Sequence, residues 1–241
     1  MREPSWRAFA LALWRREAGP LAGLFVGASL VLGFVMLAEE VIEGDTDRID
    51  NAVLALFRSA ADPLRPAGPP WLVEIGRDVT ALGSFALLGI IFLASVGYLL
   101  LLRKRALALL TTVAILGGTA LSQALKSLFD RPRPELGETV RVFTASFPSG
   151  HATLSAVTFL TLGALLTRAS ADGRIKVYFM SLAVLLTVLV GVSRLYLGVH
   201  YLSDVLAGWC LGTAWALICW SGARWLQLRG RVERPEEEDP R

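Results

Sequence analysis

Six apolar runs dominate this chain and constrain its fold more than any other feature. A helix of about 20 predominantly apolar residues is long enough to span the hydrocarbon core of a bilayer. Of the 241 residues, 54% are hydrophobic and 19% are charged, a balance that excludes an ordinary soluble domain. The sequence therefore predicts an all-α, polytopic membrane bundle with six transmembrane helices. These helices are expected at Leu21–Ala38, Thr80–Leu102, Ala106–Leu125, Ala152–Thr167, Val177–Val192 and Val205–Trp225.

The distribution of cations indicates how these helices are oriented. Cytoplasmic loops carry an excess of Lys and Arg, and with the N-terminus inside, fifteen of the 24 Lys and Arg residues fall on the cytoplasmic side. This predicts an inner (plasma) membrane protein with both termini in the cytoplasm. The nine outer cations are numerous for that side, so we expect several of them to have another role. The basic residues are scattered along the chain, which excludes a nucleic-acid-binding face.

Three segments flank the predicted transmembrane domain, which covers residues 20–228. Residues 1–19 place aromatic and aliphatic side chains on one helical face beside arginines, a pattern typical of an interfacial amphipathic helix. Residues 39–79 form an outer insert in which 47–61 repeat the amphipathic pattern. Residues 229–241 are highly charged, which is typical of a disordered tail.

Three polar clusters interrupt the apolar pattern. They read KSLFDRPRPE after the third run, FPSGH before the fourth, and SRLYLGVHYLSD between the fifth and sixth. The predicted topology places all three on the same side of the membrane, facing the periplasm or extracellular space. Both histidines of the chain, an aspartate and four cations converge there. Ionisable groups at membrane depth are costly and usually functional.

The converging cations and the turn before the fourth run suit an anion. Lys126, Arg133 and Arg194 offer three positive charges with many hydrogen-bond donors, which matches a phosphate group. Ser149 and Gly150 begin a helix, whose free backbone N–H groups and dipole also favour an anion. Glycine at this point lets the backbone approach a ligand closely. We therefore expect a phosphate-binding site.

The two histidines add acid–base and nucleophilic chemistry to this site. His200 and Asp204 are separated by four residues, so on a helix they share a face. The carboxylate then holds the Nδ1–H of the ring and leaves Nε2 free to attack, as in the base-and-orienter arrangement of a catalytic triad. His151 is the remaining candidate for a proton donor.

Each feature taken singly also has a structural explanation. Lys126, Arg131 and Arg133 are of the type that extends towards lipid headgroups, and Ser149 is a plausible helix cap. Both histidines with Asp204 form a feasible zinc or iron ligand set. A metal leaves the neighbouring cations unexplained, because they would repel it. The cations, both histidines and Asp204 are all expected on one side of the membrane, and this favours a phosphate site over the separate structural explanations.

The same residues resemble the type-2 phosphatidic-acid phosphatase family, also called lipid phosphate phosphatases. Its first signature is Lys, six residues and Arg-Pro, here Lys126 to Pro134. The second is Pro-Ser-Gly-His, here Pro148 to His151. The third is Ser-Arg, five residues, His, three residues and Asp, here Ser193 to Asp204. All three are complete and in order.

The resemblance implies a role for each matching residue. His200 is expected to attack phosphorus and form a phosphohistidine, Asp204 to orient it, and His151 to protonate the leaving oxygen. Arg131 lies in the variable gap of the first signature and receives no catalytic role. The family needs no metal and no cofactor. The phosphate-binding residues are then Lys126, Arg133, Ser149, Gly150 and Arg194.

The implied substrate is a phosphate or diphosphate of a membrane lipid. Phosphatidic acid, phosphatidylglycerol phosphate and polyprenyl diphosphates such as undecaprenyl diphosphate are all compatible, and the bacterial composition slightly favours the last. A phosphotransferase that passes the phosphoryl group to another acceptor, a phosphatase of soluble phosphomonoesters and a non-catalytic lipid-binding or transport protein remain alternatives. A haloperoxidase, which shares these signatures around vanadate, is disfavoured by the membrane spans.

Overall fold

The described part of the chain is a bundle of eight α-helices. A computed structural model describes residues 6–134 and 145–228, with side chains from residue 19 onward. Five of these helices are long and apolar enough to cross a membrane, and the number is six if the bent pair α3 and α4 forms one span. The predicted all-α membrane bundle is therefore confirmed. The helices are α1 (Trp6–Glu43), α2 (Asp47–Leu56), α3 (Pro70–Ala81), α4 (Phe85–Leu101), α5 (Arg105–Phe129), α6 (Gly150–Arg168), α7 (Gly173–Tyr196) and α8 (Leu202–Leu228).

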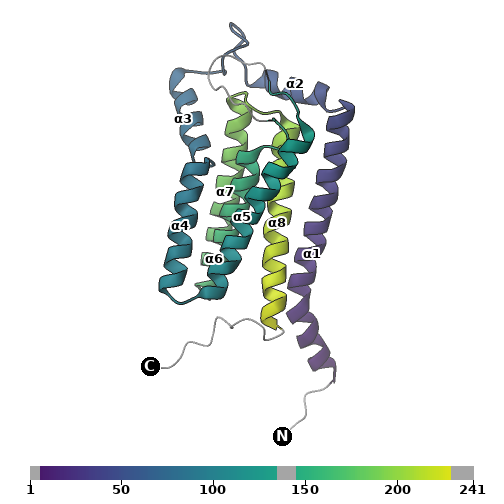
Figure 1. The fold of residues 1–241 in the computed structure, drawn as a ribbon, viewed down its shortest axis with the longest axis vertical. Coiled ribbons are helices and arrows are strands. Elements are labelled where there is room, and N and C mark those ends of the chain that lie inside the picture. Colours follow the sequence, from purple (N-terminus) through teal and green to yellow (C-terminus); the bar gives the residue numbers. More distant parts are fainter. Residues whose placement is uncertain (1–5, 135–144, 229–241) are drawn as a thin grey trace.

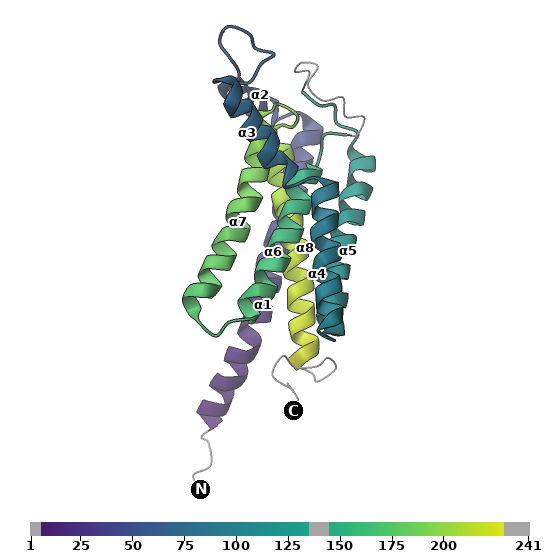
Figure 2. The same cartoon turned by 90° about the vertical axis from the view of Figure 1, so that its left-hand side faces the viewer.

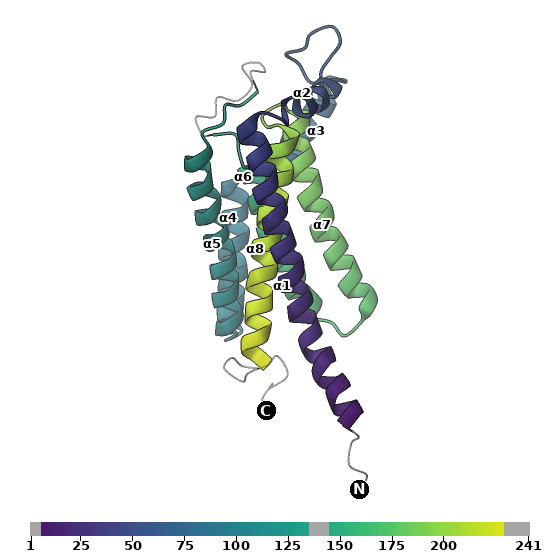
Figure 3. The same ribbon diagram turned by 90° about the vertical axis from the view of Figure 1, so that its right-hand side faces the viewer.

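The long helices run side by side, and α2 lies across one end of the bundle (Figure 1). Helix α6 packs against both α7 and α8, and more than half of its most apolar stretch is buried inside the protein. Figure 2 shows α6 and α8 between α7 on one side and α4 with α5 on the other. Helix α1 lies along α8, and its first turns extend past the rest of the bundle (Figure 3). The first and last described helices therefore begin and end at the same end of the bundle.

Small residues allow α6 and α8 to approach each other closely. A Cβ added at Gly208 would lie 2.8 Å from the backbone oxygen of Ser149, and one at Gly212 would lie 2.5 Å from that of Thr153. Both distances are below any normal contact, so neither position has room for a side chain. Two glycines four residues apart on one helix face are a common device for close contact between membrane helices. This contact fixes the start of α6 against the start of α8.

Three element boundaries differ from those expected from the sequence. Residues 6–19 of the expected interfacial segment and the first span are joined in one helix, α1, because the Ala- and Leu-rich flanks of Pro20 continue the helix through the proline. The span expected from Thr80 is broken between α3 and α4 by a bend of 41°. Ser84 caps the new helix by accepting a hydrogen bond from the Leu87 N–H. In the outer insert, helix α2 ends at Leu56, earlier than expected.

Candidate active site

The residues of the three polar clusters meet at the end of the bundle that α2 covers. They come from the end of α5, the start of α6, the end of α7 and the turn before α8. Phe147 anchors the segment that leads into α6, because its fully buried ring packs against Phe34 of α1 and Phe129 of α5. This aromatic cluster positions the turn from which α6 begins.

His200 and Asp204 form the buried centre of the site. His200 Nδ1 lies 3.2 Å from Asp204 Oδ2, and both side chains are almost completely excluded from solvent. The same carboxylate oxygen accepts hydrogen bonds from the Ser146 hydroxyl and from the Tyr201 N–H, the latter at 2.9 Å. Asp204 is thus held from several directions, and it in turn orients the imidazole. This is the pairing that the spacing of the two residues predicts.

The other ring nitrogen of His200 faces a cation. Arg133 Nη1 lies 3.0 Å from His200 Nε2 and 2.9 Å from the carbonyl oxygen of Val199. A guanidinium only donates hydrogen bonds, so Nε2 is the acceptor and the proton of the neutral ring sits on Nδ1, towards Asp204. Burial lowers the pKa of His200 well below its ordinary value, and the contacts with Asp204 only partly oppose this. The ring is therefore neutral, with the Nε2 lone pair directed at the cationic side of the site.

Lys126 and Gly150 lie beside Arg133. The Lys126 ammonium donates a 2.8 Å hydrogen bond to the carbonyl oxygen of Ala145, to which an Arg133 guanidinium nitrogen also points at 3.4 Å. A Cβ added at Gly150 would lie 3.3 Å from Lys126 Cε, so the absence of a side chain there keeps the lysine close to the start of α6. Two cations thus face the first turn of that helix.

Ser149 begins α6 and leaves a donor unused. Its N–H donates to the carbonyl oxygen of Asp204 at 2.9 Å, which ties the start of α6 to α8. Its hydroxyl is buried and has no hydrogen-bond partner. Buried polar groups are rarely left without a partner. An anion bound at this helix N-terminus would satisfy the hydroxyl together with the free N–H groups of the first turn.

His151 and Arg194 are the last two of the predicted site residues, and they lie beside the break between α3 and α4. Arg194 Nη1 donates to the Thr80 hydroxyl at 2.9 Å, while its Nε is buried without a partner. The charges of Arg194, Arg133 and Lys126 all act on the imidazole of His151. A Cβ at Gly83 would come within 3.5 Å of the His151 side chain, so the break itself lies against this ring. All eight residues singled out in the sequence therefore gather at one end of the bundle.

Arg131, which received no role from the sequence, is part of this site. Its guanidinium donates to Asp204 Oδ1 at 2.8 Å and to Asp50 Oδ2 at 2.9 Å. Asp50 is buried on α2 and also accepts hydrogen bonds from the N–H and the hydroxyl of Ser203. Although burial disfavours the charged form, Asp204 and Asp50 raise the pKa of Arg131 above its ordinary value. The sequence contains a sign that Asp50 is buried: it lies three residues before Val53, and so on the same face of α2 as that apolar residue.

Comparison with known proteins agrees with this geometry. Residues 105–227, which include α5 to α8 and every residue of the three signatures, match the model of the PAP2 superfamily. The chain belongs to the PAP2 superfamily. The family resemblance seen in the three signatures is thereby confirmed. Among the described residues, no three His, Cys, Asp or Glu side chains are arranged to hold a metal ion, so the metal-ligand set of both histidines and Asp204 is not assembled.

The relatives of this PAP2 chain are named as phosphatases of lipid phosphates. Phosphatidylglycerophosphatase B of Bacillus subtilis is 31% identical over 78% of this chain and 90% of its own length. The lipid A 1-phosphatase of Rhizobium etli is 30% identical over 62% of this chain and 71% of its own length. The crystal structure of a transmembrane PAP2-type phosphatidylglycerolphosphate phosphatase from Bacillus subtilis aligns with a TM-score of 0.74 and 26% identity, covering 88% of this chain and all of that one.

The first four helices of this PAP2 protein lie outside the matched region, yet α2 and α3 contact the site. Asp50 on α2 holds Arg131, and Thr80 on α3 accepts from Arg194. Arg58, in the segment after α2, donates to the carbonyl oxygens of Leu195 and Tyr196 at the end of α7. Arg58 and Arg131, two of the nine cations expected on the outer side, therefore have structural partners.

Proposed function

We propose that this protein hydrolyses the phosphate or diphosphate group of a membrane lipid through a phosphohistidine intermediate on His200. One observation carries the proposal above all. The attacking nitrogen of His200 faces the guanidinium of Arg133 at 3.0 Å, while the opposite nitrogen is held by Asp204. A neutral nucleophile and a phosphate-binding cation thus meet at one point, which is the arrangement that attack on a phosphoryl group requires.

In the first step the Nε2 lone pair of His200 forms a bond to phosphorus, and the bond from phosphorus to the lipid oxygen breaks. His151 donates a proton to that oxygen, so the alcohol (or, from a diphosphate, the lipid monophosphate) leaves in a protonated form. Asp204 stabilises the positive charge that develops on the His200 ring. The cations Lys126, Arg133 and Arg194 balance the charge on the equatorial phosphoryl oxygens, with the N–H groups of the first turn of α6.

In the second step water attacks phosphorus as His151, now neutral, accepts a proton from it. The bond to Nε2 breaks, inorganic phosphate is released, and His200 returns to its neutral state. His151 must therefore be protonated when the substrate arrives, although the helix N-terminus disfavours a positive charge there. We expect the bound phosphate dianion to favour protonation, so that proton uptake accompanies substrate binding.

Membrane spans and named relatives support a lipid as the substrate. The site lies at one end of a bundle with five to six membrane-crossing helices, so a phosphate headgroup reaches it while the acyl or prenyl chains stay in the bilayer. The excess of Lys and Arg at the opposite end supports an orientation in which the site faces the periplasm or extracellular space. Relatives named for phosphatidylglycerol phosphate and for lipid A support a lipid phosphomonoester or diphosphate.

The test measures phosphate release by the purified protein from a panel of lipid phosphates in the presence of EDTA. A rapid quench with ³²P-labelled substrate should trap an acid-labile, base-stable label on the wild type and none on His200→Ala. The exposed Tyr178, near the opposite end of α7, provides the control Tyr178→Ala, which should keep the label. Labelling that survives in His200→Ala would remove the proposed nucleophile. Activity lost in EDTA and restored by a divalent cation would overturn metal independence.

A further inference from the structure

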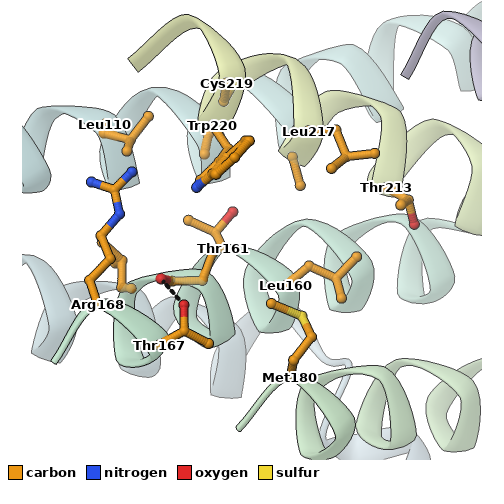
Figure 4. A pocket seen from close by; sticks show the side chains of 14 residues that line it. Leu110, Leu160, Thr161, Thr167, Arg168, Met180, Thr213, Leu217, Cys219 and Trp220 are labelled. Carbon is orange, nitrogen blue, oxygen red and sulfur yellow. Dashed lines mark hydrogen bonds between the residues drawn. The ribbon is translucent and has the colours of Figure 1, made fainter. Parts of the chain in front are cut away.

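A second cavity lies at the opposite end of the bundle from the candidate active site. It has a volume of about 370 Å³ and lies between α5, α6, α7 and α8. Figure 4 shows Leu217 and Trp220 of α8 on one wall and Leu160 with Met180 on the facing wall. None of the residues assigned to phosphate chemistry lines it. Such a cavity has the size and the apolar lining of a site for a small amphiphilic ligand.

Arg168, the last residue of α6, closes one end of this cavity beside Leu110 (Figure 4). Its Nη1 is buried and has no hydrogen-bond partner. Within residues 19–134 and 145–228, whose side chains the structure describes, no acidic residue lines the cavity. Arg168 is partly buried, and the charge of Arg224, which has the same sign, also acts on it. A buried cationic donor without an acceptor is costly, and a second cation nearby increases that cost. The missing partner is therefore an anion.

We propose that this cavity binds an anionic membrane lipid. One acyl chain occupies the apolar cavity, and a phosphate oxygen of the headgroup accepts the hydrogen bond that Arg168 Nη1 leaves unused. Basic pockets between transmembrane helices near the cytoplasmic surface are suited to anionic headgroups. The apolar lining favours a lipid over a soluble anion, because a soluble anion leaves the cavity unfilled. The site does not depend on the proposed function, since no group of the active site takes part.

The experiment compares thermal unfolding of the full-length protein in a neutral detergent with three additives. Phosphatidylglycerol and phosphatidylcholine with identical chains separate the charge from the chain, and glycerophosphoglycerol, a phosphodiester, supplies the headgroup alone. We expect phosphatidylglycerol to stabilise the wild type most and glycerophosphoglycerol to have no effect. By native mass spectrometry, Arg168→Gln should weaken phosphatidylglycerol binding by about tenfold or more, as expected when a charged hydrogen bond is lost.

Two further variants keep the proposal open to refutation. Ala164 lines the cavity, so Ala164→Phe should fill it and abolish the effect while Arg168 is retained. Arg133→Gln alters the active site and should leave phosphatidylglycerol binding at the second cavity unchanged. Equal stabilisation by the two lipids would overturn the proposal. So would a phosphatidylglycerol preference that persists in both Arg168→Gln and Ala164→Phe, or one that disappears in Arg133→Gln. Stabilisation by glycerophosphoglycerol that Arg168→Gln abolishes would show a site for soluble anions instead of a lipid.

Discussion

Replacing Arg131 by glutamine tests whether this residue positions the catalytic pair without touching the substrate. Its guanidinium joins Asp204 Oδ1 at 2.8 Å to Asp50 Oδ2 at 2.9 Å, and its side chain is only 10% exposed. Arg131→Gln therefore removes one charge partner from each of two buried carboxylates. Asp204 keeps its contacts with Ser146 and His200, so the carboxylate stays in place but is less firmly held.

The expected magnitude follows from the number of interactions lost. Removing one partner of a buried ion pair costs about 3–5 kcal/mol of folding free energy. A charged hydrogen bond contributes about 1.5–3 kcal/mol. If the bond to Asp204 contributes that much to orienting His200 in the transition state, kcat falls by about 10- to 100-fold. KM should change little, because the guanidinium of Arg131 is already paired with Asp47, Asp50 and Asp204. The cation that faces the nitrogen proposed to attack is Arg133.

The assay is phosphate release over a range of lipid-phosphate concentrations, with thermal unfolding measured on the same samples. Arg65 provides a matched control, since it is 81% exposed and pairs only with Asp62 among the ion pairs of the described residues. Arg65→Gln should change neither kcat nor stability. The reasoning is refuted if Arg131→Gln raises KM while kcat is unchanged, because Arg131 would then bind the substrate itself. A normal kcat in a destabilised Arg131→Gln would reduce its role to folding.

Three further predictions concern helix contact, pH and phosphate binding. Gly212→Leu should lower the free energy of unfolding by about 1–3 kcal/mol, because a Cβ there would lie 2.5 Å from a backbone oxygen of α6. Gly222 on the same helix has open space around it, so the control Gly222→Leu should leave thermal unfolding unchanged. Burial holds the pKa of His200 low, so the unfolded chain binds a proton that the native state does not as the pH falls below about 6.5. Between pH 8 and pH 5 the free energy of unfolding should therefore fall more steeply for the wild type than for His200→Gln, by up to about 1.4 kcal/mol per pH unit, and thermal unfolding at each pH measures this. Thr80→Val removes the hydroxyl that accepts a hydrogen bond from Arg194, and it should raise KM up to about tenfold in steady-state assays while kcat stays nearly unchanged. A fall in kcat alone would contradict a role of Arg194 in substrate binding.

The sequence predicted those parts of the site that depend on spacing along one helix or on the side of the membrane. His200 and Asp204 pair as expected, although His200 lies in the turn before α8 and not on the helix; Asp204, in the first turn of α8, reaches back to it. Lys126 lies beside Gly150 because the third run ends, and the fourth begins, at the same end of the bundle. These relations are local, or follow from counting membrane crossings, so no knowledge of helix contacts is needed.

The contacts of Arg131 depend on geometry that spacing does not reveal. Helix α5 ends at Phe129, and Asp130 adopts a left-handed backbone conformation with φ of 34°. The chain turns there, which sends Arg131 towards α8 and α2. Its partner Asp50 lies 81 positions earlier, on a helix that crosses the end of the bundle. Only the folded arrangement brings them together. The break before α4 was missed for another reason: Gly83 and Ser84 interrupt an apolar run that looks continuous by composition.

The position of Arg133 suggests how the resting site is protected until the substrate arrives. Its guanidinium donates to His200 Nε2, so the lone pair proposed to attack phosphorus is engaged in a hydrogen bond. A neutral imidazole is a weaker acceptor than a phosphate dianion, which offers a charged and bidentate partner to the same guanidinium. We therefore expect phosphate binding to draw Arg133 from the ring to the substrate and to free the proposed nucleophile in the same movement. Asp204 stays fixed by its other partners, so the ring needs no reorientation before the attack.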